Sequence, residues 1–229
     1  MKRALRWAQG LVLMAALTGL NQLAAAGPRE TSPKITIYAY NFAEVDGRTL
    51  REAEQVATGI FRKAGVETQW VNIASTSQNM QSHSAAHRPY YLSDLQLDIL
   101  PPVMVQRLGA PTNVMGVAPG TEPDRRLVYL FYDRVKALAE KEMKARVDGA
   151  ISAYAIRVQI LGHAIAHEIG HILLNLEFHS DTGIMRGDWD LKQLHDACFG
   201  YLVFTPPQAE AIRLEVGRRS GLQKTLELN

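Results

Sequence analysis

Residues 152–174 constrain the fold of this chain more than any other segment. They form a glycine-poor stretch that is apolar on nearly every side, which predicts one long helix through the centre of a domain. Its histidines His167 and His171 are four residues apart, so they would lie about 6 Å apart along the helix axis and about 40° apart around it. One metal ion can bind two imidazoles in that arrangement.

Glu168 follows the first of these histidines and completes the pattern HExxH, which is typical of zinc hydrolases. Its carboxylate would point beside the metal, where it can accept a proton from a water molecule, so we expect Glu168 to act as a general base. The alternative is a core helix whose two histidines are only hydrogen-bonded. A glutamate between the histidines disfavours that alternative.

A catalytic zinc site takes three protein ligands and keeps its fourth position for water. His179 is the predicted third ligand, because it follows His171 by eight residues and Asn175 between them tolerates the left-handed conformation at which helices end. His163 would lie too far from His171 to share an ion, so we interpret it as a packing residue or a support for the ligands. The other candidates for the third ligand are Glu177, Asp181, Asp190, His195 and Asp196.

The run HEIGHILLNLEFHSDTGIM, residues 167–185, resembles the zinc-binding signature and methionine turn of the metzincin metalloproteases. The resemblance implies a zinc ion held by His167, His171 and His179, with Glu168 as the base. It also implies that Met185 lies beneath the metal. Two features depart from the family pattern: a leucine replaces the usual glycine, and the third histidine follows the second by eight residues instead of six. We therefore expect a metzincin-like variant.

The first 26 residues predict a secretory signal peptide. Lys2, Arg3 and Arg6 precede an apolar run at residues 11–20, and residues 24–26 are alanines of the kind found before cleavage sites. An uncleaved anchor is the alternative, although the apolar run is short for a bilayer span. We expect an exported protein, secreted or periplasmic, with no stable membrane insertion after cleavage.

Charge and cysteine content narrow the classes of partner. Cleavage after Ala26 would remove three of the 25 basic residues and none of the 23 acidic ones, which leaves a net charge of −1. A nucleic-acid surface, which needs clustered Lys and Arg, is not expected. Cys198 is the single cysteine of the sequence, so no intrachain disulfide can form and no thiol in an N-terminal segment can mask a zinc ion. The oligomeric state stays open.

Residues 27–229 are predicted to form a single metalloprotease-like catalytic domain, with an upper lobe at about 34–175 and a lower lobe at about 176–229. A further helix would begin at Pro206, capped by Thr205 and Gln208. The fold class is therefore α+β and zincin/metzincin-like, with a mixed twisted β-sheet, a long active-site helix and a small C-terminal lobe. Periodicity predicts strands at 34–40, 66–73, 96–100, 114–118 and 127–132, and helices at 49–63, 135–146 and 152–174.

Residues 75–91 are rich in Ser, Gln, Asn and His, which predicts a long loop over the sheet. His83 and His87 have the spacing of a second metal site if this loop is helical. A solvated loop is the favoured interpretation.

These features predict a zinc-dependent peptidase with Zn²⁺ as its cofactor and a peptide or protein as its substrate. The strand at 114–118 is the expected sheet edge for an extended peptide. No tyrosine directly follows Met185, so no second group is assigned to stabilise the oxyanion. Two alternatives stay open: an exported zinc-binding or interaction protein without turnover, and a zinc amidase acting on a non-protein amide such as a cell-wall crosslink.

Overall fold

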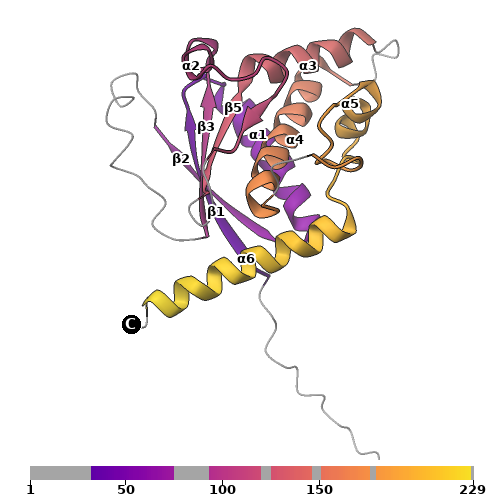
Figure 1. Ribbon diagram of the computed structural model, residues 1–229. Helices are drawn as coiled ribbons and strands as arrows, with labels where there is room; N and C mark the ends of the chain where they lie inside the picture. The colour runs from indigo at the N-terminus through magenta and orange to yellow at the C-terminus, as the bar shows by residue number, and fades with distance from the viewer. Residues whose placement is uncertain (1–31, 75–92, 120–124, 146–150, 176–178, 228–229) are drawn as a thin grey trace, which may run out of the picture. The chain divides into compact units, whose positions relative to one another are not determined.

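A five-stranded mixed sheet lies at the centre of the computed structural model, which describes residues 32–74, 93–119, 125–145, 151–175 and 179–227 (Figure 1). Residues Ser32–Asn229 form one compact unit. The predicted signal peptide, the loop with His83 and His87, and Glu177 fall outside the described residues, so those predictions stay as they were. The division into two lobes also stays a prediction.

The strands follow the order β2-β1-β3-β5-β4, and the β4 strand at the edge is antiparallel to its neighbour while the others run parallel. Four strands lie within two residues of their predicted bounds: β1 (Lys34–Asn41), β2 (Glu67–Ile73), β3 (Asp94–Leu100) and β5 (Leu127–Phe131). β4 covers only Gly116–Val117, shorter than predicted, and it is an edge strand as expected. The described residues therefore have an α+β fold with a mixed sheet.

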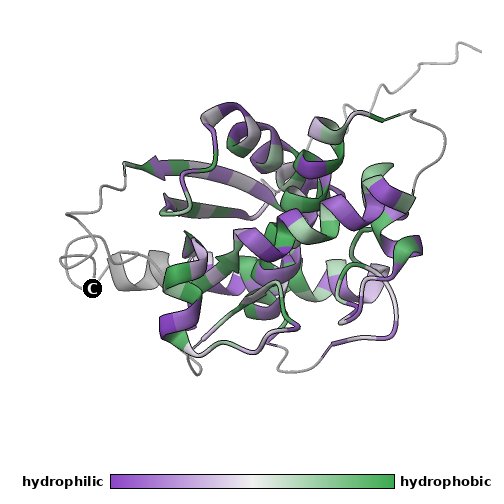
Figure 2. Cartoon of the chain, turned by 90° about the horizontal axis from the view of Figure 1, so that it is seen from above, coloured by the Kyte–Doolittle hydropathy of each residue, from purple (hydrophilic) through white to green (hydrophobic). Residues whose placement is uncertain are grey.

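Two helices pack closely against each other on one side of this sheet, α1 (Gly47–Lys63) and α4 (Ala153–Leu173) (Figure 1). Gly162 lies at their crossing, where an added Cβ would fall 2.5 Å from the Cβ of Val56. Every α4 residue from Ile160 to Leu173 is buried. The prediction of a long helix through the core is confirmed. In Figure 2, hydrophobic and hydrophilic residues alternate along the helices and strands.

Both ends of α4 form as local sequence predicts. The Ser152 side chain accepts a hydrogen bond from the Ala155 amide at 3.1 Å and caps the start. At the other end Asn175 has φ 48°, the left-handed conformation that stops the helix and redirects the chain. His179, the next described residue after Asn175, lies beside the histidines of α4.

Two short helices were not predicted, α2 (Pro102–Leu108) and α5 (Leu191–Cys198). Pro102 begins α2 and Gly109, at φ 62°, ends it. α5 begins with a capping box in which the Asp190 side chain accepts hydrogen bonds from two amides. These caps were present in the sequence, but the helices are too short to show a clear 3.6-residue period.

The remaining helices are α3 (Tyr132–Ala145), which begins three residues earlier than predicted, and α6 (Pro206–Glu227). The predicted capping box of α6 is confirmed: the Thr205 amide donates to Gln208 Oε1 at 2.9 Å, and the Gln208 amide donates to Thr205 Oγ1 at 3.5 Å. Ile212 and Val216 of α6 are fully buried, as expected. None of the helices in the described part of the chain is long and apolar enough to cross a membrane.

Candidate metal centre

His167 is held in one orientation by a buried hydrogen bond. Its Nδ1 lies 2.7 Å from the carbonyl oxygen of Ile184. A carbonyl can only accept, so Nδ1 carries the proton and Nε2 keeps its lone pair. The second nitrogen of the ring is thereby available to a metal ion.

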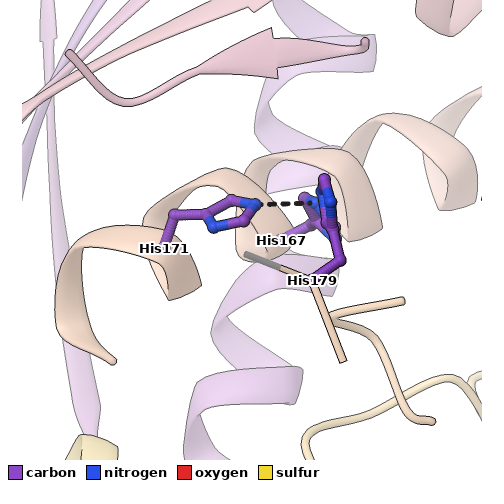
Figure 3. A group of neighbouring side chains, drawn as sticks. All are labelled: His167, His171 and His179. Carbon is purple, nitrogen blue, oxygen red and sulfur yellow. Dashed lines mark hydrogen bonds between the residues drawn. The ribbon is translucent and has the colours of Figure 1, made fainter. Parts of the chain in front are cut away.

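Three imidazoles surround one point (Figure 3). One nitrogen from each of His167, His171 and His179 lies within 4.8 Å of the others, and the Nε2 atoms of His167 and His171 are 3.2 Å apart. Two nitrogens bound to one tetrahedral zinc at about 2.05 Å would be about 3.3 Å apart. Spacing and donor type therefore fit a zinc ion held by these three residues.

A tight turn brings His179 to the helix. The amide of Ser180 donates to the carbonyl of Met185 at 2.9 Å, which closes the loop between them. The chain then passes Gly187, where an added Cβ would lie 2.8 Å from Cγ of His179. A side chain at that position would displace the ring, so glycine is required for His179 to lie where it does.

Met185 lies beneath the same turn of α4. It is fully buried, and its Sδ would be 2.5 Å from a Cβ added at Gly170, the residue before His171. The neighbouring Ile184 holds His167, as described above. Met185 therefore packs against α4 next to His171, and its place beneath a metal ion stays a prediction.

Glu168 is buried beside the cluster, with 3% of its surface exposed. Gly116 of β4 lies against its side chain, since an added Cβ would fall 2.8 Å from both Cγ and Cδ of Glu168. Burial raises the pKa of this carboxyl to about 8, and the charge of Arg125 opposes the shift. Burial therefore makes this carboxylate a stronger base than a solvated glutamate, which favours transfer of a proton to it from a nearby water molecule.

Burial has the opposite effect on His167. The pKa of the imidazole is lowered to about 3, mainly by burial. The neighbouring His171 and His179 contribute to this decrease, and the hydrogen bond to Ile184 opposes it. His167 is therefore neutral at physiological pH. Neutral imidazole is the form that binds metals.

An open cleft of about 1030 Å³ lies over these residues. One wall is formed by residues 113–118, including β4, and the other by the loop at 186–190. His167, Glu168, His171 and His179 all line the cleft, so solvent and a ligand of peptide size have access to them.

The other candidate ligands that the structure describes do not join the cluster. Asp181 lines the cleft but does not join the cluster, and Asp190 caps α5. His195 faces Glu142 at 3.9 Å, and Asp196 accepts from Lys192. His163 is buried, with its Nδ1 2.7 Å from the carbonyl oxygen of Gln159, so it packs within α4.

Among the cleft residues, Arg125 and Trp189 were not predicted from the sequence, nor was the contact of Gly116 with Glu168. Trp189 is buried, and its ring meets that of His167 edge to face at 5.7 Å. Arg125 donates through Nε to the carbonyl of Ala118 at 2.9 Å. No local pattern marks these residues, because strand pairing and the turn after α4 bring them to the site.

No family model matches the chain, and no curated protein matches it. Among solved structures, the crystal structure of an archaemetzincin from Methanopyrus kandleri is similar to it with a TM-score of 0.43 and 13% sequence identity, covering 83% of this chain and 99% of that one. A likeness this low carries no argument about function. The case for function therefore depends on the histidines, the glutamate and the cleft.

Proposed function

We propose that this chain is a zinc-dependent peptidase, a metzincin-like variant that acts after export. One observation carries the proposal: three imidazoles converge on one point at the floor of an open cleft, with the buried Glu168 beside them. A closed structural zinc site has four protein ligands and no use for a neighbouring base. Three ligands and an adjacent carboxylate are the arrangement of a hydrolytic site.

The chain's own residues have distinct tasks in this reaction. Zinc, when bound, would acidify a water molecule and polarise the substrate carbonyl. Glu168 accepts a proton from the attacking water and gives it to the leaving amine as the peptide bond breaks. His167, His171 and His179 fix the position of the ion, while Ile184 keeps His167 in the required tautomer. Gly116 lets the substrate-facing strand approach Glu168.

The substrate we propose is a peptide segment in extended conformation. β4 is an edge strand and forms a wall of the cleft, so a peptide can add to it by backbone hydrogen bonds while its carbonyl reaches the site. This mode of binding recognises a backbone rather than one side chain. It supports a peptide over a small amide without an extended backbone.

The test combines metal analysis with hydrolysis of a mixed peptide library. The wild-type protein should bind one zinc ion per chain and cleave peptides. Glu168→Gln should retain the metal and lose activity by about a thousandfold or more, because it removes the base and not a ligand. His195→Gln is a matched control outside the cluster and should keep both properties.

Two results would contradict the proposal. Stoichiometric zinc with no hydrolysis of any peptide would indicate a binding protein without turnover. Hydrolysis of a non-protein amide such as a muropeptide crosslink, with peptides left intact, would indicate an amidase. Equal activity of Glu168→Gln and wild type would remove the assigned role of Glu168.

A further inference from the structure

The hydrogen-bonding direction of β4 defines which of its groups face the cleft. The amide of Phe131 donates to the carbonyl of Met115 at 2.8 Å, and Gly116 is paired with Leu130. Backbone groups alternate sides along a strand, so those of Gly116 point away from β5. By the same alternation the carbonyl of Ala118 points to the open edge.

Arg125 covers that carbonyl. Its Nε donates to the oxygen of Ala118 at 2.9 Å, which fixes the guanidinium group at one end of the open edge. The terminal nitrogens of Arg125 have no partner among the residues that the structure describes. Arg125 lines the cleft. A fixed cation, whose terminal nitrogens have no hydrogen-bond partner in the described part of the chain, therefore lies along the path of an added strand.

We propose that Arg125 binds a carboxylate of the substrate, about two residues on the amino-terminal side of the bond to be cleaved. This inference rests on the proposed peptidase function and names the substrate class: peptides with Asp or Glu at that position. A guanidinium with two free nitrogens forms paired hydrogen bonds with a carboxylate, which a neutral amide cannot match.

The position follows from strand spacing. Gly116 lies against Glu168, so the substrate residue opposite Gly116 is near the scissile bond. Ala118 is two residues further along, about 7 Å at the rise of a strand. Antiparallel pairing is the more stable arrangement for an added strand. An antiparallel peptide has its amino-terminal residues at the Ala118 end.

Apart from Glu168, the acidic side chains of the cleft belong to a different segment. Asp181, Asp188 and Asp190 come from the chain after His179, whereas Arg125 precedes β5. Asp190 already accepts from the Lys192 amide and lies 3.8 Å from Arg186. Among the described residues, Arg125 forms no ion pair with these three aspartates.

The test uses zinc-loaded full-length protein and a series of peptides in which one position at a time is Glu or Gln. Wild type should prefer Glu about tenfold or more at the second residue before the cleaved bond, mainly through a lower KM, as expected for a charge-assisted hydrogen bond. Arg125→Gln should reduce the ratio to about one, and Arg125→Lys should retain part of it. Arg126→Gln is the matched control, because Arg126 does not line the cleft, and it should keep the preference.

A binding measurement separates failure of this inference from failure of the proposed function. The same peptides are titrated into the Glu168→Gln protein, with and without Arg125→Gln, and fluorescence anisotropy reports binding. If no peptide is hydrolysed by wild type, the peptidase proposal fails and the binding ratio still decides the role of Arg125. A Glu-to-Gln ratio near one, a ratio unchanged by Arg125→Gln, or a preference confined to the carboxyl-terminal side would overturn the inference.

Discussion

Gly116 and Glu168 are in direct contact: a Cβ added to the glycine would lie 2.8 Å from the carboxyl carbon of the glutamate. The glycine belongs to the edge strand and the glutamate to the metal-bearing helix. The cleft wall and the base are thereby fixed against each other. Any side chain at Gly116 must move the strand or the carboxylate.

Gly116→Ala should lower kcat/KM by about 100-fold, since displacement of a reacting group by about 1 Å has an effect of that order. Zinc content should be unchanged, because the atoms nearest to the new Cβ belong to Tyr129 and Glu168 and not to a histidine. Steady-state kinetics and metal analysis of the purified variant measure both. Gly59→Ala is the control: it has open space around it within α1 and should keep full activity. Wild-type kinetics in Gly116→Ala would show that the contact is dispensable.

Gly170→Ala should destabilise the protein by about 1–3 kcal/mol, although alanine normally favours a helix. The reason is Met185, whose sulfur would lie 2.5 Å from the new Cβ. Urea unfolding should show the opposite sign for Gly59→Ala. Met185→Ala alone should cost about 2–5 kcal/mol through the cavity it leaves.

The double variant Gly170→Ala/Met185→Ala tests whether the two residues act as a pair. If the methionine sulfur is the obstacle, the double variant should be more stable than the sum of the two single changes predicts. Strict additivity would mean that the new methyl group meets some other atom, of which Phe204 is the nearest candidate.

Hydrophobic periodicity and capping residues predicted most of the sheet and the long helices. An element with one buried face has apolar residues at regular intervals along the sequence, and that regularity can be recognised. His167, Glu168 and His171 follow from a single turn of α4. The position of His179 was harder to predict, because it depends on the left-handed Asn175 and on the closed turn between Ser180 and Met185. The eight-residue spacing from His171 is compatible with His179 as a ligand, but it does not determine where His179 lies.

The contact between the cleft wall and Glu168 could not be predicted in the same way. Strand pairing between β4 and β5 brings Gly116 to Glu168, and no property of residue 116 within its own segment shows that contact. Trp189 and Arg125 likewise reach the site through tertiary structure. The short helices α2 and α5 were not predicted, because seven or eight residues contain too few turns to show a helical period of apolar residues.

Metal removal should lower the thermal stability of the wild-type protein. A ligand at about 100 times its Kd adds about 2.7 kcal/mol to the folded state, which corresponds to a change in Tm of about 5–10 °C for a domain of this size. Differential scanning calorimetry with zinc and with a chelator measures the difference. His179→Ala should lose most of the zinc-dependent shift, whereas His195→Gln should retain it. A full shift in His179→Ala would redirect the search for the third ligand to Asp181 and Glu177.

Asp98 gives the fold a pH dependence that is separate from the metal centre. It lies between Tyr40 and Tyr129 in the register of the sheet, 7% exposed, and its Oδ1 accepts from Gln96 Nε2 at 2.9 Å. Burial raises the pKa of this carboxyl from 3.8 to about 6, and the hydrogen bond from Gln96 opposes the shift. The folded state therefore retains a proton that the unfolded state has lost between these two pH values.

The free energy of unfolding should then fall as pH rises from 3.8 to about 6, because the folded state binds more protons in that window. The loss is on the order of 3 kcal/mol for a shift of this size. Asp98→Asn should remove this dependence, so the difference between wild type and variant, measured by urea unfolding of both zinc-loaded proteins across pH 3.5–8, isolates the group. Gln96→Leu should extend the window upward, since it removes the hydrogen bond that lowers the pKa. A difference curve that is flat with pH would mean that Asp98 stays ionised in the folded protein.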